Sequence, residues 1–185
     1  KHLSLASDGA FGKFDKQQLQ RGFQVYKEVC SACHSLKLVA FRDLKALGYN
    51  DAEVKAIAGG FNVPGIDPNT GEANTRPGIA TDKFPMPFAN DVAARAANNN
   101  AVPPDLSLMT KARHDGAAYV YSLLTGYQNP PANLPAANRP GQGLHYNPYF
   151  PNLNLAMAPP LTAEGQVTYG EGNPKPTVDQ MAKDV

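Results

Sequence analysis

The chain has 185 residues, enough for one domain with its own core, and its 17 basic and 16 acidic side chains give a formal net charge of +1. This balance is atypical of nucleic-acid-binding proteins, which carry a large excess of one sign. The two cysteines, Cys30 and Cys33, lie too close in sequence for a disulfide framework. No apolar stretch approaches the roughly 18 residues of a membrane-spanning helix.

The first predicted element is a helix that leads into the cysteine pair. Asp15 is a candidate N-cap for a helix over residues 18–29. Phe23, Tyr26 and Cys30 follow at i, i+3 and i+7, the spacing of one helical face. The helix therefore presents its apolar face and the first cysteine on the same side.

Two further helices are predicted before a long loop. A short helix is expected over residues 39–47, and Asn50 with Glu53 forms a capping box for another that ends at residues 59–60. Residues 60–88 lose all periodicity and are rich in Gly, Pro and Asn, so they are interpreted as a loop.

The second half of the chain alternates short helices with irregular segments. The capping and breaking residues predict helices over residues 92–97, from Asp105 toward Arg113, over 115–126, and from 177 to the end. Residues 127–176 hold ten of the 17 prolines and show no periodic pattern. The predicted fold class is therefore mainly α, as one domain over residues 1–185 with long ordered loops rich in Pro and Gly.

Cys30, Cys33 and His34 form the Cys-x-x-Cys-His motif that attaches haem c. On a helical turn, cysteines three residues apart present both sulfur atoms to one side, where they can form thioethers with two vinyl groups at one porphyrin edge. His34 follows directly and becomes the proximal iron ligand. The motif predicts one covalently bound haem c, electron transfer as the function, and a cytochrome c-like helical fold in which irregular chain wraps the haem.

Two other interpretations of the motif are a redox dithiol and half of a zinc site. A thioredoxin-like dithiol would follow a strand in a βαβ context, whereas a helix leads into this motif. A four-ligand zinc site would need a second His, from His2, His114 or His145. Haem attachment is the favoured interpretation.

The residues alone leave the sixth iron ligand open between two methionines. Met86 and Met157 both lie in apolar loops flanked by Pro, which stiffens the approach of the chain. Small Ala neighbours let the backbone at Met157 approach a flat ring, whereas two phenylalanines would crowd Met86, which is assigned to packing of its loop. Met109 and Met181 lie on expected helices, where Met is more often core filler. A vacant sixth position would instead indicate a stand-alone c-type haem enzyme or a gas sensor.

Two polar residues are candidates for contacts with the haem propionates. Arg113 lies between two expected helices, where its guanidinium could form a bidentate ion pair, although a lone Arg is more often solvated. Asn98 belongs to a run of three asparagines that most simply caps a helix C-terminus, and its amide could also reach a propionate.

Beyond the motif, residues 21–35 strongly resemble the haem-binding segment of the cytochrome c1 family. Further blocks follow in the order of that family and extend the resemblance over most of the chain from about residue 15 to 185. These blocks are residues 93–99, 103–107, 112–114, 122–127, 147–151 and 157–160.

The resemblance implies a set of site residues that the spacing did not provide. It makes Met157 the second axial ligand, beside the His34 of the motif, and supports Arg113 as the propionate partner. It also places Pro103 and Pro104 against the haem, where a backbone carbonyl of this segment can orient His34.

The resemblance also implies partners and a location. Members of this family are haem c subunits of the quinol–cytochrome c reductase, with cytochrome b as a neighbour, a Rieske iron–sulfur protein as electron donor and a soluble or anchored cytochrome c as acceptor. Members continue into a C-terminal membrane anchor beyond the segment that matches residues 179–185, so the chain is expected to be a soluble core piece without that anchor. Residues 12–15 and 129–143 resemble bacterial members, which implies the periplasmic side of the inner membrane. The chain alone is not expected to oxidise quinol.

Overall fold

The structure is a computed structural model that describes residues 1–185, and helices are its main regular elements. The α-helices are α1 (Lys16–Glu28), α2 (Asp51–Gly59), α3 (Asp91–Ala97), α4 (Met109–Ala112), α5 (Gly116–Thr125) and α6 (Val178–Asp184). Three 3-10 helices span Cys30–Ala32, Phe41–Leu47 and Ala136–Asn138. The strands β1 (Asn62–Ile66) and β2 (Ala73–Pro77) form one antiparallel pair, and β3 (His145–Tyr146) and β4 (Asn154–Leu155) form another.

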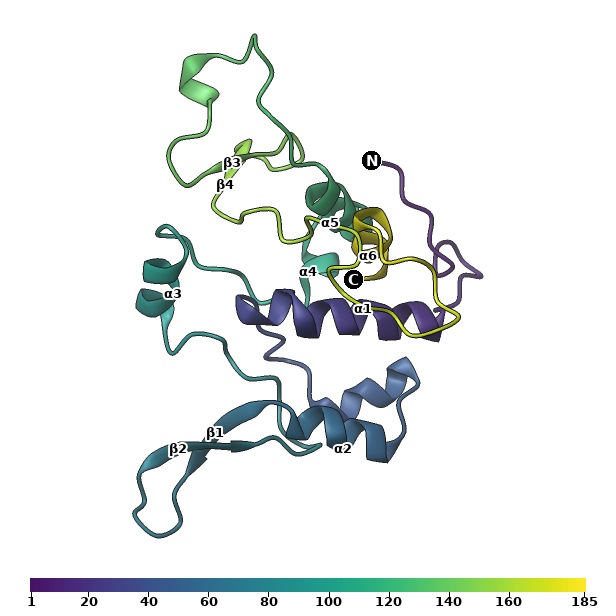
Figure 1. Ribbon diagram of the computed structural model, residues 1–185, viewed down its shortest axis with the longest axis vertical. Helices are drawn as coiled ribbons and strands as arrows, with labels where there is room; N and C mark the ends of the chain where they lie inside the picture. Colours follow the sequence, from purple (N-terminus) through teal and green to yellow (C-terminus); the bar gives the residue numbers. More distant parts are fainter.

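Helix α1 lies through the middle of the molecule, with α2 and the β1–β2 hairpin on one side and α5 and α6 on the other (Figure 1). Its N-cap Asp15 accepts hydrogen bonds from the backbone N–H groups of Gln17 and Gln18, which satisfies donors that a helix start leaves free. One face of α1 buries Phe23 and Tyr26, whereas Val25 is buried on the opposite face. The helix thus serves two separate cores.

The first core cluster is aromatic and centres on Phe84. The Phe84 ring lies 4.5 Å from the Phe41 ring, 5.8 Å from that of Tyr26 and 6.0 Å from that of Phe23, centroid to centroid. Such offset and edge-on contacts add to the stabilisation from buried apolar area. This cluster holds residues 41–84 against α1.

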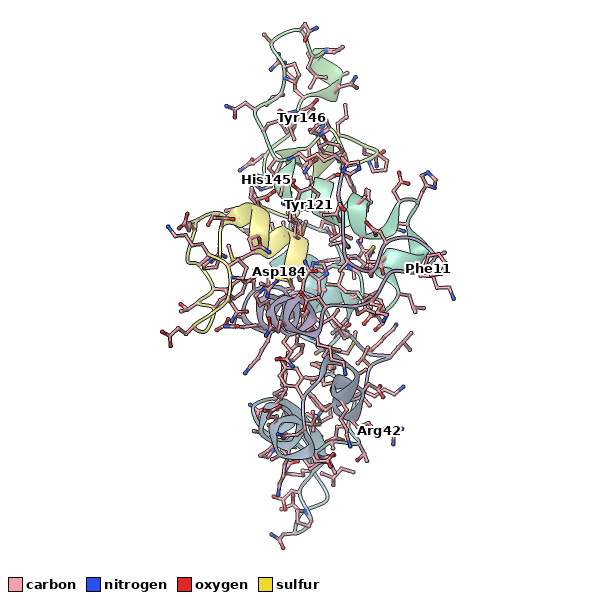
Figure 2. All side chains as sticks on the ribbon, turned by 90° about the vertical axis from the view of Figure 1, so that its right-hand side faces the viewer. Phe11, Arg42, Tyr121, His145, Tyr146 and Asp184 are labelled. Atoms are coloured by element: carbon pink, nitrogen blue, oxygen red, sulfur yellow. The ribbon has the colours of Figure 1, made fainter.

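The second core cluster joins α1 to the C-terminal part of the chain. Val25 packs there with Tyr121 of α5 and with the fully buried Met181 of α6. Next to it, the Arg21 guanidinium binds the Asp184 carboxylate, whose side chain is completely buried, at 2.9 Å. Figure 2 shows Asp184 beside α1, where α6 packs against that helix.

Most of the predicted helices are confirmed. Asp15 and Asn50 cap α1 and α2 as expected, Asn90 caps α3, and α5 and α6 occupy the predicted segments. Two predictions need correction in detail. Residues 41–47 form a 3-10 helix rather than an α-helix, and the helix expected from Asp105 is the single turn α4.

The interpretation of residues 60–88 as a structureless loop is wrong, because the segment contains the β1–β2 hairpin. Asp67 accepts the N–H groups of Asn69 and Thr70, and Gly71 adopts a φ of +74°, so the turn closes through local chemistry. All of β2 is exposed, which explains why no alternating apolar pattern marked it.

The chain keeps an unusually large surface for its size. It exposes 11458 Å², whereas a compact monomer of 19.8 kDa exposes roughly 8600 Å². The β1–β2 hairpin and the loop around residues 136–138 extend away from the centre (Figure 1). None of the helices combines the length and the apolar character that a membrane crossing needs.

Candidate haem-attachment site

The cysteine motif forms the continuation of α1. The backbone N–H groups of Cys33 and His34 both donate to the carbonyl oxygen of Cys30, at 3.1 and 2.9 Å, so the motif is one tight helical turn. Both cysteines are free thiols and partly exposed. Burial, and then the neighbouring Cys33, raise the pKa of the Cys30 thiol to about 11. Two thiols on one turn are the arrangement that a double thioether needs.

The imidazole of His34 is held through its Nδ1 atom, which lies 2.7 Å from the carbonyl oxygen of Pro104. A carbonyl can only accept, so Nδ1 carries the proton and Nε2 is the ring nitrogen with a free lone pair. The backbone of His34 is also fixed, because the Tyr26 hydroxyl donates to its carbonyl oxygen at 3.0 Å. The side chain is therefore oriented as a ligand through Nε2.

The segment that carries Pro104 is tied to the motif by the carboxylate of Asp105. Its Oδ2 atom accepts from the Ser35 hydroxyl at 2.6 Å and from the Lys37 N–H at 2.8 Å, and Oδ1 accepts from the Ser107 N–H at 2.9 Å. Burial opposes ionisation, yet these hydrogen bonds outweigh it and lower the pKa of Asp105 to about 2. Asp105 is thus ionised at neutral pH.

Met157 follows strand β4 in a loop that hydrogen bonds hold in place. The Tyr127 hydroxyl donates to the Met157 carbonyl oxygen at 2.7 Å, and burial raises the pKa of that phenol. The side chain of Met157 is half-buried.

The loop before Met157 is anchored by Asn147, which is fully buried. Its amide nitrogen donates to the Leu123 carbonyl at 2.7 Å, and its amide oxygen accepts from the Tyr149 N–H at 3.0 Å. Both amide atoms are therefore satisfied, and they join the loop to the end of α5.

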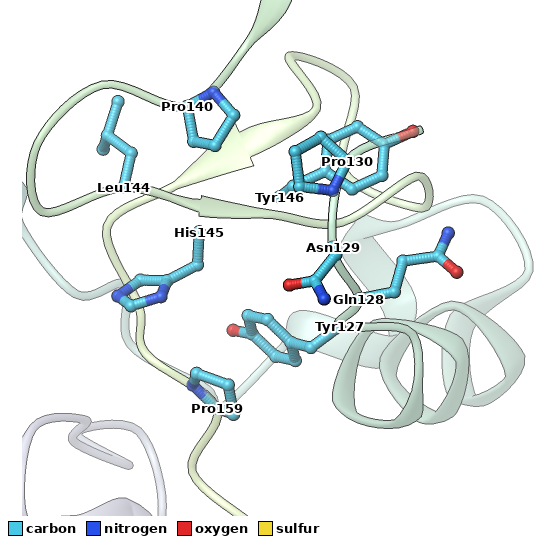
Figure 3. A pocket seen from close by; sticks show the side chains of 9 residues that line it. All are labelled: Tyr127, Gln128, Asn129, Pro130, Pro140, Leu144, His145, Tyr146 and Pro159. Carbon is cyan, nitrogen blue, oxygen red and sulfur yellow. The ribbon is translucent and has the colours of Figure 1, made fainter. Parts of the chain in front are cut away.

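A cavity of about 470 Å³ opens beside this loop (Figure 3). His145 and Tyr127 face it, and Pro159, two residues after Met157, forms part of its wall. The cavity borders the segment that carries the candidate sixth ligand.

The other predicted residues lie apart from these contacts. Arg113 is exposed and its side chain makes no hydrogen bond or ion pair within the chain. Asn98 is the C-cap of α3 and its amide donates to the Ala94 carbonyl at 2.7 Å. Met86 is 59% exposed, so the expectation that it packs within its loop is wrong.

These residues fit a covalently bound haem. The motif supplies two free thiols and an imidazole with a protonated, engaged Nδ1 atom. Half-buried Leu36 and Leu106 lie on the two segments that Asp105 joins, next to His34. No group of three or more His, Cys, Asp or Glu side chains gathers where it could hold a metal ion, so the donor set of a four-ligand zinc site is not formed.

Comparison with known proteins agrees with this site. The model of the family described as "Cytochrome C1 family" matches residues 5–185. The Rhodospirillum rubrum protein named "Cytochrome c1" is 46% identical over 189 residues, covering 96% of the chain and 69% of that relative. The chain belongs to the cytochrome c1 family.

Other family members are similar over the same region. A Solanum tuberosum protein named "Cytochrome c1-2, heme protein, mitochondrial" is 48% identical over 177 residues, 96% of the chain and 66% of that relative. A Candida albicans protein named "Cytochrome b-c1 complex catalytic subunit, mitochondrial" is 46% identical over 178 residues, 96% of the chain and 60% of the relative. The chain spans about half to two thirds of the length of several such cytochrome c1 relatives.

Several positioning residues of this site were not singled out from the sequence. Asp105 was interpreted as a helix start, whereas its carboxylate joins two distant segments. Tyr26, Tyr127 and Asn147 act through hydrogen bonds to residues 8 to 30 positions away. For Asp105, the one signal in the sequence was an Asp directly after two prolines. An Asp in that place can cap a helix or accept hydrogen bonds from a distant segment, and the sequence does not distinguish the two roles.

Proposed function

We propose that the chain binds one haem c covalently through Cys30 and Cys33 and passes single electrons. The observation that carries this proposal is the helical turn of the motif. In this turn, His34 donates from Nδ1 to the Pro104 carbonyl, which leaves the lone pair of Nε2 free to bind iron. When bound, the haem supplies one-electron iron chemistry, which no side chain of the protein supplies.

Met157 is the proposed sixth ligand. Its loop is held from two sides, through the Tyr127 hydroxyl and through the buried amide of Asn147. A held loop suits a thioether, which binds iron weakly and needs a preset approach. The competing Met86 is largely exposed and lies next to Phe84, which is committed to the first core cluster. Ligation by His34 and Met157 would raise the reduction potential of a bound haem and close its iron to small substrates.

Arg113 and Asn98 are proposed to contact the haem propionates. The guanidinium of Arg113 has no partner in the chain, so it is free to pair with a carboxylate of the cofactor. One N–H of the Asn98 side-chain amide already donates to the carbonyl oxygen of Ala94. Asn98 therefore offers one remaining N–H, and its contribution is the weaker of the two.

The chain is proposed to act within a quinol–cytochrome c reductase at the periplasmic side of a bacterial inner membrane. It accepts electrons from a Rieske iron–sulfur protein and passes them to a cytochrome c, beside cytochrome b. The name of the Candida relative, which includes the b-c1 complex, supports assembly into such a complex. The surplus of exposed surface is in keeping with a subunit that contacts several partners.

The proposal is tested by spectra of the purified haem-loaded protein. We expect acid acetone to leave the colour on the protein, because thioethers are covalent, and we expect the reduced protein to bind no carbon monoxide. Haem extracted by the solvent would overturn the roles of Cys30 and Cys33. Rapid carbon monoxide binding would instead support a haem enzyme or gas sensor with a labile sixth ligand.

A further inference from the structure

The carboxylate of Asp105 lies at the junction of two segments that are about 70 residues apart in the sequence. One segment is residues 35–38, directly after His34, and the other is residues 104–107, which carries the carbonyl that holds the His34 ring. Besides the three hydrogen bonds to Asp105, the Leu106 N–H donates to the Ser35 carbonyl at 2.9 Å and the Leu38 N–H donates to the Ser107 hydroxyl at 3.1 Å. We call these five hydrogen bonds the Asp105 clamp.

The carboxylate is surrounded by donors, among them the Ser35 hydroxyl and the N–H groups of Lys37 and Ser107. Only an acceptor with two oxygens satisfies them together. An Asn side chain would turn an NH₂ group toward one of the two backbone N–H groups, whichever way it was flipped. The arrangement is therefore specific for a carboxylate.

The clamp acts on His34 through the peptide bond between Pro104 and Asp105. That peptide unit is planar, so fixing the Asp105 side chain on three donors restricts the direction of the Pro104 carbonyl. The carbonyl oxygen lies 2.7 Å from Nδ1 of His34. A well-aligned hydrogen bond at Nδ1 makes the imidazole more electron-donating at Nε2.

We propose that Asp105 is a positioning residue that sets the electron-donating strength of His34 by holding the Pro104 carbonyl on its Nδ1–H. This inference rests on the proposed role of His34 as an iron ligand. An imidazole that donates more strongly favours the ferric state. Loosening the clamp should therefore favour the ferrous state and raise the reduction potential.

Two variants of the haem-loaded protein separate orientation from charge. Asp105→Asn removes one negative charge and one backbone hydrogen bond, whereas Ser35→Ala removes the 2.6 Å hydrogen bond and leaves the net charge unchanged. Asp67→Asn is the matched control, because Asp67 accepts two backbone N–H groups in the distant hairpin turn and its loss removes the same charge.

At a fixed ambient potential near the wild-type midpoint, we expect the ferrous-to-ferric ratio to rise roughly threefold to tenfold in Asp105→Asn, the equivalent of one hydrogen bond. The ratio should rise less in Ser35→Ala, and in Asp67→Asn it should equal that of the wild type. Hydrogen exchange at the Lys37 or Ser107 amide should speed up in Asp105→Asn. If the substitution only let water reach the haem, the more highly charged ferric form would be favoured. The reduction potential would then fall instead of rising.

An unchanged or lowered ratio in Asp105→Asn would overturn the inference. A rise in Asp105→Asn without any change in Ser35→Ala or in amide exchange would also overturn it, because Asp105 would then act by charge alone. If Asp105→Asn yields no folded protein, Ser35→Ala decides, with an unchanged ratio counting against the clamp. The wild type checks the proposed function separately, because loss of colour to acid acetone would reject covalent attachment whatever the variants show.

Discussion

Gly22 of α1 and Asp184 of α6 touch backbone to backbone. A Cβ atom built at Gly22 would overlap the carbonyl oxygen of Asp184. One residue earlier, Arg21 binds the carboxylate of the same Asp184. The two helices that lie near the ends of the chain therefore cross at a point where only a glycine fits.

We predict that Gly22→Ala destabilises the protein by about 2 to 3 kcal/mol, because the helices must move apart and strain the second core cluster. The measurement is the free energy of unfolding in urea. Gly59→Ala is the control, since nothing lies within 4 Å of a Cβ atom at Gly59, and it should change stability by less than about 1 kcal/mol. Equal stability of the two variants would show that the crossing has room to spare.

We predict that Met157→Leu removes the near-infrared sulfur-to-iron band of the ferric protein, lowers the potential and lets carbon monoxide bind. The substitution keeps the side-chain volume and removes the ligand sulfur, so packing should change by less than about 1.5 kcal/mol. Met86→Leu is the matched control and should alter none of these properties, because Met86 is exposed. The reverse behaviour of the two variants would assign the ligand to Met86.

We predict that Arg113→Ala keeps the haem and lowers its potential, because a positive charge beside a propionate disfavours the ferric state. Since Arg113 is exposed and unpaired within the chain, thermal stability should fall by no more than about 1 kcal/mol. The measurement is a redox titration, with Arg42→Ala as the control, because Arg42 is also exposed and lies on the side of α1 that carries α2 (Figure 2). Identical potentials in both variants would leave Arg113 as an ordinary surface charge.

The low pKa of Asp105 predicts a specific loss of stability in acid. The folded value of about 2 lies below the ordinary value of about 3.9, so the unfolded chain binds the proton more tightly. The contribution of Asp105 is therefore complete above about pH 4 and is lost as the pH falls toward about 2.

We expect Asp105→Asn to cost about 1 to 3 kcal/mol at neutral pH, and this difference from the wild type should shrink as the pH drops through that range. Urea midpoints measured from about pH 7 to about pH 2.5 provide the test. A difference that stays constant with pH would mean that the charge of Asp105 does not contribute to stability.

Local chemistry in the sequence was enough to predict most helices. The caps Asp15, Asn50 and Asn90 act on donors two or three residues away, so the signal and the structure lie in the same short window. The β1–β2 hairpin was not predicted because every residue of β2 is exposed, Val63 is the one buried residue of β1, and Pro64 and Gly65 interrupt that strand. A periodic pattern cannot reveal a strand that buries almost nothing.

The candidate site also has one part that the sequence predicts and one part that it does not. Cys30, Cys33 and His34 are contiguous, so their spacing alone indicated the chemistry. The contacts that orient them join positions about 70 residues apart, as in His34 to Pro104 and Ser35 to Asp105. No spacing rule pairs such positions, and the role of Pro104 was expected only through the family resemblance.

Because α1 contributes one face to each core cluster, dividing the molecule after residue 100 would leave one cluster incomplete and expose apolar surface of α1. Residues 101–185 alone would lack Val25, and residues 1–100 alone would expose it. Because the same helix packs in both clusters, unfolding of α1 would expose both, and we expect them to unfold in one cooperative transition. The helix that leads into the cysteine motif is thus also the element on which both core clusters depend.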